Sequence, residues 1–188
     1  MGGWVGFGGG TGKGEEKGGV KQDEDHITVT PTVPEPGISG GGDIGLRLFR
    51  YFGIQTGIAG ITDYAPYTPP GVEELYSKVS ITQIPVLARV NGLFGMGNDH
   101  YVFVAGFGGI GMNVTVSAGA GSADPGMSFI AGGELGGGNQ YLDIYFKYQY
   151  IGSLSGGSLT VDGRSYDYSM KNHTLSFGAR VFLPPFRK

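Results

Sequence analysis

Cysteine is absent from this chain of 188 residues, so the sequence can form neither a disulfide nor a thiolate metal site. It also contains no run approaching the roughly 18 apolar residues that a membrane-spanning helix needs. Charged residues make up only 15% of the chain, compared with about 25% in an average soluble domain. Side chains suited to a water-facing surface are therefore scarce.

Strong net charge is missing as well. The formal net charge is -3, and no basic cluster is present that could hold a phosphate backbone, so we expect no nucleic acid among the partners. The opening sequence, MGGWVGFGGG, lacks the order of basic, apolar and small residues that marks a signal peptide. If the protein is exported, we expect this chain to be a mature form.

Glycine and alternating side chains are what the sequence has instead. It contains 39 glycines. In the stretch YLDIYFKYQYIG, Leu142, Ile144 and Phe146 fall on one parity, whereas Asp143 and Lys147 fall on the other. Successive side chains of a strand point to opposite faces, so this stretch is predicted to be a β-strand with one apolar and one charged face.

Similar patterns predict eight strands within one domain spanning residues 1–188. Only residues 71–78 could wind a helical turn, and we interpret them as part of a loop. The predicted strands cover residues 3–10, 38–50, 53–63, 78–90, 100–113, 128–135, 141–152 and 172–183.

The connections between these strands alternate in length. Three are short, and four are long and rich in proline, turn residues and charge; the long ones cover residues 12–37, 65–77, 114–127 and 153–171. Short turns at one end and long loops at the other are typical of bacterial outer-membrane barrels. The sequence therefore predicts an all-β fold, an eight-stranded antiparallel up-and-down transmembrane β-barrel.

The two faces of the strands are predicted to divide between lipid and lumen. An arginine or lysine on the lipid face near the midplane costs about 2–4 kcal/mol, so the charged parity should point inward, where side chains fill an eight-stranded interior. The expected ion network, which would plug the lumen, consists of Asp43, Arg47, Arg89, Glu134, Asp143, Lys147 and Arg180. The residues expected to face lipid are Ile44, Leu46, Leu48, Leu142, Ile144, Phe146, Leu175, Phe177 and Val181.

Aromatic residues beside the short turns are expected to contribute to an interfacial girdle, because amphipathic rings collect at the membrane boundary. They are Tyr51, Phe52, Phe94, Tyr101 and Tyr141.

Four segments carry a resemblance to a known group: GWVGFGGG near the start, ITQIPVLARV, the pair FIAGGELG and YLDIYFKYQYIG, and the closing LSFGARVFL. Together they resemble the small eight-stranded outer-membrane barrels of the OmpA, OmpX or opacity-protein type. The resemblance implies a bacterial outer-membrane location, a lipid bilayer with lipopolysaccharide as the surroundings, a host or surface ligand reached through the loops, and a monomer. Such proteins end on an aromatic residue, whereas PPFRK follows the last strand here, so Phe182 or Phe186 would serve that role.

Motifs that could indicate a nucleotide site lack the required context. Glycines match G-x-G-x-x-G at 106, 108 and 111 and again at 40, 42 and 45, but no amphipathic helix follows either match. The stretch GGGTGKGEE imitates a phosphate loop without the required first glycine and final Ser or Thr, and we interpret it as a flexible loop. We expect no cofactor and no metal site, since His26, His100 and His173 are scattered along the chain.

An enzyme that modifies lipid would need a nucleophile and a base within hydrogen-bond reach. His173 and Ser176 lie three apart and hence on opposite faces of one strand, although His100 and Ser128 could meet across strands. We therefore expect a non-enzymatic scaffold that displays loops. The alternatives are a narrow channel for small or hydrophobic solutes and, third, a lipid-modifying outer-membrane enzyme.

Overall fold

A computed structural model describes most of the chain. The described residues are 2–22, 25–29, 37–49, 51–64, 79–97, 100–117, 122–123, 125–155, 157–161 and 164–183. Residues 71–78, for which a helical turn was weighed, lie outside these ranges. No helix long and apolar enough to span a membrane occurs in the part of the chain that the structure describes.

The described secondary structure consists of β-strands. They are β1 (Gly2–Gln22), β2 (Asp25–Val29), β3 (Gly37–Arg47), β4 (Phe52–Tyr64), β5 (Val79–Gly97), β6 (His100–Ser117), β7 (Ser122–Ala123), β8 (Gly126–Gly138), β9 (Leu142–Ser155), β10 (Gly157–Val161) and β11 (Arg164–Leu183).

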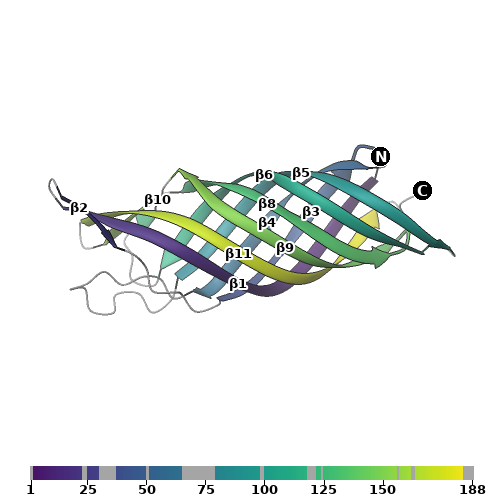
Figure 1. The fold of residues 1–188 in the computed structure, drawn as a ribbon, viewed down its shortest axis with the longest axis horizontal. Helices are drawn as coiled ribbons and strands as arrows, with labels where there is room; N and C mark the ends of the chain where they lie inside the picture. Colours follow the sequence, from purple (N-terminus) through teal and green to yellow (C-terminus); the bar gives the residue numbers. More distant parts are fainter. Residues whose placement is uncertain are drawn as a thin grey trace.

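Eight of these strands form a closed barrel (Figure 1). In order around the wall they are β1, β3, β4, β5, β6, β8, β9 and β11, each antiparallel to the next, and β11 pairs with β1 to close the circle. The prediction of an eight-stranded antiparallel up-and-down barrel is confirmed. Both chain termini lie at one end, which we call the turn end because the short connections are there; the opposite end is the loop end.

Strands at the loop end are longer than the sequence predicted. β1 and β11 remain paired from Gly3↔Leu183 to Val20↔Tyr166. At the loop end, β2 pairs with the last residues of β1, and β10 pairs with the first residues of β11. Three of the predicted long loops, 12–37, 114–127 and 153–171, are partly strand. The prediction of a flexible loop at GGGTGKGEE is wrong, because this stretch lies within β1. Backbone pairing across β1 and β11 outweighs the turn-like composition.

The outer wall is apolar. Along β9, the outward side chains include Ile144 and Phe146, the latter 67% exposed, and they alternate with inward Asp143 and Tyr145, each 2% exposed. Eight of the nine residues expected to face lipid are exposed on this wall: Ile44, Leu46, Leu142, Ile144, Phe146, Leu175, Phe177 and Val181. The ninth, Leu48, is half-buried in the turn after β3.

The aromatic residues near the turn end divide between the two sides of the wall. Tyr51, Phe94 and Tyr141 are exposed, and Phe52 is half-buried. Tyr101 is 3% exposed, so its expected place in an outer girdle is wrong. Its position on β6 has inward parity, and its hydroxyl finds a buried carboxylate, as shown below; a buried tyrosine usually needs such a partner.

Inward-facing glycines make room for aromatic rings inside the narrow barrel. A Cβ built on Gly178 would lie 2.5 Å from both Cζ of Tyr145 and the carbonyl oxygen of Phe7. The rings of two neighbouring aromatic residues lie over further glycines in the same way: Phe107 over Gly132 and Phe103 over Gly136. Glycine is therefore required here by close approach, because the eight-stranded interior is just wide enough for its side chains.

The outer wall yields one prediction. Phe146→Arg should lower the free energy of unfolding from lipid vesicles by about 2–4 kcal/mol, because the charge would lie in the middle of the apolar band, whereas His173→Arg at its edge should cost about 1 kcal/mol or less. Urea titration in large unilamellar vesicles measures both. Equal costs for the two variants would contradict a lipid-facing wall.

The glycines yield another. Gly178→Ala should lower stability by about 1–3 kcal/mol, because the added methyl group meets backbone and the Tyr145 ring. Gly106→Ala is the matched control, since a Cβ there meets nothing within 4 Å. Thermal unfolding in detergent compares the two variants. A Gly178→Ala protein as stable as Gly106→Ala would show that the ring and the glycine are not closely packed.

Candidate functional site

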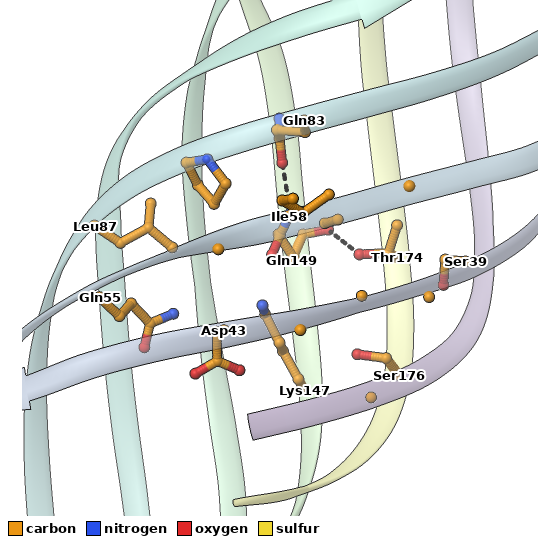
Figure 2. Close-up of a pocket in the computed structure, with 18 of the residues that line it drawn as sticks. Ser39, Asp43, Gln55, Ile58, Gln83, Leu87, Lys147, Gln149, Thr174 and Ser176 are labelled. Atoms are coloured by element: carbon orange, nitrogen blue, oxygen red, sulfur yellow. Dashed lines mark hydrogen bonds between the residues drawn. The ribbon is translucent and has the colours of Figure 1, made fainter. Parts of the chain in front are cut away.

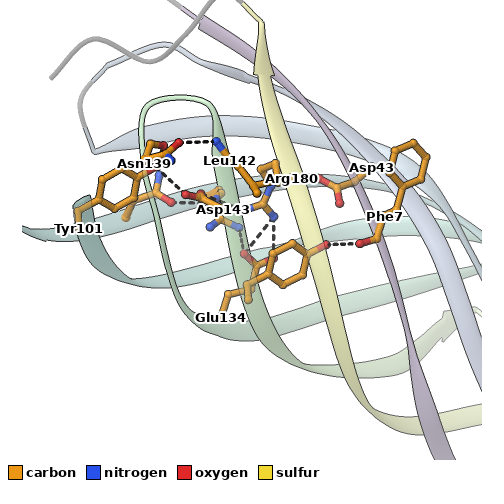
Figure 3. Close-up of polar contacts among 11 residues, drawn as sticks. Phe7, Asp43, Tyr101, Glu134, Asn139, Leu142, Asp143 and Arg180 are labelled. Carbon is orange, nitrogen blue, oxygen red and sulfur yellow. Dashed lines mark hydrogen bonds and ion pairs between the residues drawn. The ribbon is translucent and has the colours of Figure 1, made fainter. Parts of the chain in front are cut away.

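The centre of the lumen near the turn end is occupied by a carboxylate that two arginines share (Figure 3). Nη2 of Arg180 donates to both carboxylate oxygens of Glu134, at 3.2 and 3.0 Å, and Nη1 of Arg89 donates to Oε2. All three side chains are buried, with exposed fractions of 2–3%. In the order around the wall, β5 and β11 are opposite one another, so Arg89 and Arg180 reach Glu134 from opposite sides of the lumen.

Two further carboxylates lie close to the Arg180 guanidinium. Oδ2 of Asp43 lies 3.7 Å from its Nε, and Oδ2 of Asp143 lies 3.9 Å from its Nη1. The other oxygen of Asp143 accepts a hydrogen bond of 2.6 Å from the Tyr101 hydroxyl. A buried ion needs several such partners, since its desolvation is otherwise too costly.

Aromatic faces complete the surroundings of the cations. The guanidinium of Arg180 lies 4.5 Å from the ring centroid of Tyr145, and that of Arg89 lies 5.7 Å from the centroid of Phe103. Arg47 lies over Phe182, at 5.3 Å. Such contacts favour a cation most where water is excluded. Phe182, considered from the sequence as a terminal recognition residue, is buried against Arg47 inside the barrel.

Hydrogen bonds and ion pairs thus join five of the seven residues proposed for the lumen network, namely Asp43, Arg89, Glu134, Asp143 and Arg180, and the sixth, Arg47, is buried against Phe182. The seventh, Lys147, pairs in register with Glu134 and is half-buried, and its Nζ lies 5.0 Å from the Phe107 ring centroid. Four basic residues and three acidic ones make up this set, so the set carries a small positive excess. The network proposed from the sequence omitted Tyr101 and Tyr145, although their parity along β6 and β9 already placed them inside.

Toward the loop end, amides and hydroxyls replace charges. Nε2 of Gln83 donates to Oδ1 of Asn113 at 2.9 Å and to Oγ of Ser128 at 3.1 Å, and its Oε1 accepts from Nε2 of Gln149 at 3.2 Å. All four side chains are buried. The sequence did not predict this amide cluster, because neutral polar side chains do not stand out as charged ones do, although their inward parity matches that of the charged set.

A polar cavity of about 80 Å³ lies between the wall formed by β3 and β4 and the opposite side of the lumen (Figure 2). Asp43, Lys147, Gln55 and Ser39 line it. Oε1 of Gln55 and Oγ of Ser39 are buried and have no hydrogen-bond partner among the described residues. The lining and volume suit a few water molecules or one small polar solute.

The wall is interrupted beside this cavity. Between β4 and β5 the pairs Thr56↔Val86 and Ala59↔Gln83 are formed, and the two positions between them are not paired. Pro85, which has no backbone N–H, occupies this interval, and its carbonyl accepts a hydrogen bond of 2.7 Å from the Thr56 hydroxyl. A proline inside a sheet is tolerated at such an irregularity.

The one histidine–serine pair left open by the sequence does not form. His100 pairs with Gly97 at the turn end, whereas Ser128 pairs with Gly111 farther along β6. His173 is exposed on the outer wall, while Ser176 is only half-exposed. Within the described ranges, no group of three His, Cys, Asp or Glu side chains could hold a metal ion.

Two solved structures that resemble this chain are outer-membrane proteins. OprG from Pseudomonas aeruginosa gives a TM-score of 0.61 at 11% identity, with 96% of each chain covered. AlkL in DMPC lipid bilayers gives a TM-score of 0.55 at 15% identity, covering 100% of this chain and 94% of AlkL. No protein-family model and no curated protein matches the sequence. The fold is that of the small eight-stranded outer-membrane β-barrels, as the resemblance predicted.

The shared carboxylate generates a prediction. Glu134→Gln should lower the free energy of unfolding by about 3–5 kcal/mol, because it removes the charge that Arg89 and Arg180 share inside the barrel. Glu134→Asp keeps the charge and should recover part of the loss. Urea unfolding in vesicles, followed by tryptophan fluorescence, gives both values. If Glu134→Gln and Glu134→Asp were both as stable as the original protein, the cluster would not stabilise the barrel.

Proposed function

We propose that this protein is a closed outer-membrane scaffold that holds a projecting β-sheet and its loops at the cell surface, with no catalytic role. The observation that carries the proposal is the Arg89–Glu134–Arg180 cluster, which joins opposite sides of the lumen without leaving any of the three side chains accessible. A barrel closed in this way acts through its outer surface and its ends.

The projecting part supports the scaffold role. Beyond the barrel, β1 and β11 continue side by side and are flanked by β2 and β10, with β7 next to β10. Figure 1 shows β2 and β10 at the end opposite the termini. In outer-membrane barrels, short turns face the periplasm and longer loops face the outside. In that orientation, the projecting sheet would present a rigid base for contact with a host or surface ligand.

A narrow conduit is the second candidate. The polar cavity beside Pro85, together with the interrupted β4–β5 pairing, favours it, because the cavity reaches the wall at two positions where β4 and β5 are not paired. In this alternative, small solutes would use the cavity while the charged cluster remained closed to ions.

Conductance distinguishes the two candidates. In a planar bilayer the original protein should show no steady ion current, and Glu134→Gln should produce one, because Arg89 and Arg180 then lose the shared carboxylate that holds them together across the lumen. Glu134→Asp is the charged control and should stay closed. A steady current through the original protein would overturn the plugged scaffold. Swelling of protein-containing liposomes in small neutral solutes, abolished by filling the cavity with Ser39→Leu, would instead establish the conduit.

A further inference from the structure

The outer wall changes character along β11 toward the loop end. From the turn end, its exposed outward residues are apolar as far as Leu175, and the next two on the same face are His173 and Lys171. The apolar part spans about 26 Å along the strand at roughly 3.3 Å per residue, which, given the strand tilt, corresponds to most of an outer-membrane apolar band of about 25 Å. His173 and Lys171 therefore lie where lipid tails give way to headgroups.

His173 is held in place by neighbouring aromatic residues. Its Nδ1 is 2.7 Å from the Tyr148 hydroxyl, and its ring centroid lies 5.0 Å from that of Tyr150. The Tyr150 ring packs edge-on against Phe129, at 6.1 Å. Nδ1 is hydrogen-bonded to the Tyr148 hydroxyl. The other imidazole nitrogen, Nε2, is therefore the one that can hydrogen-bond to a ligand.

Space for the rest of a lipid lies next to this histidine. A depression of about 660 Å³ includes Tyr148 and Leu175, the residues adjacent to His173 on the apolar side, together with Phe146, Leu135 and Val104. Gly133, which pairs in register with Tyr148, also lines it and leaves the surface low there. The outward-facing side chains named here are exposed, and all except the tyrosine are wholly apolar. The inward-facing positions Glu134, Lys147 and Ser176 also border the depression, beneath this apolar outer part.

We propose that Lys171 and His173 bind the phosphate headgroup of an outer-leaflet lipid whose acyl chain lies in this depression. The inference rests on the proposed outer-membrane location. Charge complementarity identifies the occupant: the Lys171 ammonium and the imidazole N–H suit a phosphate, and the apolar depression beside them suits an acyl chain. A free phosphate would contact only the two basic side chains and would leave the apolar depression empty.

Native mass spectrometry tests the site. Folded protein is released from mixed micelles that hold equal amounts of lipid A and enzymatically dephosphorylated lipid A. The original protein should retain the phosphorylated form at least fivefold more, since one basic residue near a membrane surface contributes about that factor. Lys171→Gln combined with His173→Ala should bring the ratio close to one. Tyr148→Phe, which keeps the ring but releases the imidazole, should give an intermediate ratio.

His100→Ala is the matched control, because His100 is an exposed histidine at the opposite end of the barrel; its ratio should equal that of the original protein. Equal retention of the two lipids by the original protein, or an unchanged ratio in the double variant, would overturn the site. A barrel that inserts into vesicles and stays closed but shows no headgroup preference would contradict the lipid site alone. Failure to insert would contradict the proposed function first.

Discussion

The pairing of β1 with β11 is the interaction on which the rest of the structure depends. Apolar side chains cover the outside of the wall, and lipid tails offer no hydrogen bonds, so an open edge in that environment would leave a row of backbone groups unsatisfied. The β1–β11 ladder removes both edges at once. Closure at eight strands also creates an interior that is only just wide enough for its side chains to fill.

Filling that interior imposes two physical requirements. Large rings need space, and inward glycines such as Gly178 and Gly132 provide it. Charges need partners, because the desolvation of an ion is costly. Glu134 accepts hydrogen bonds from Arg89 and Arg180, which come from opposite sides of the wall. Asp43 and Asp143 also lie close to Arg180. Rings and ion pairs interleave, so the arginines gain aromatic contacts as well. A charged lumen thereby becomes a packed core.

The outer face has an organisation of its own. Along β11 it is apolar over most of the height of a membrane's apolar band and ends at His173 and Lys171, where Tyr148 and Tyr150 combine apolar rings with polar hydroxyls. Side chains therefore alternate along the strands of the wall: charged and polar residues occupy inward positions, and apolar residues occupy outward ones. The proposed roles of the protein follow this division, since a closed lumen leaves the outer wall and the projecting strands as the surfaces that can bind partners.

The sequence by itself determined the number of strands in the barrel wall and, for eight of the nine residues expected to face lipid, the side of the wall on which they lie, because these depend on local alternation and on the length of connections. It could not determine which inward residues meet. Arg89 and Glu134 lie 45 positions apart, and their contact depends on the register between strands and on barrel closure, both of which are set by backbone pairing over the whole circle. For the same reason, the continuation of β1 and β11 beyond the barrel overrode a loop-like composition, and His100 and Ser128 remain far apart along β6. Alternation assigns a side chain to a face; only tertiary structure decides its neighbours, since these come from strands distant in the sequence.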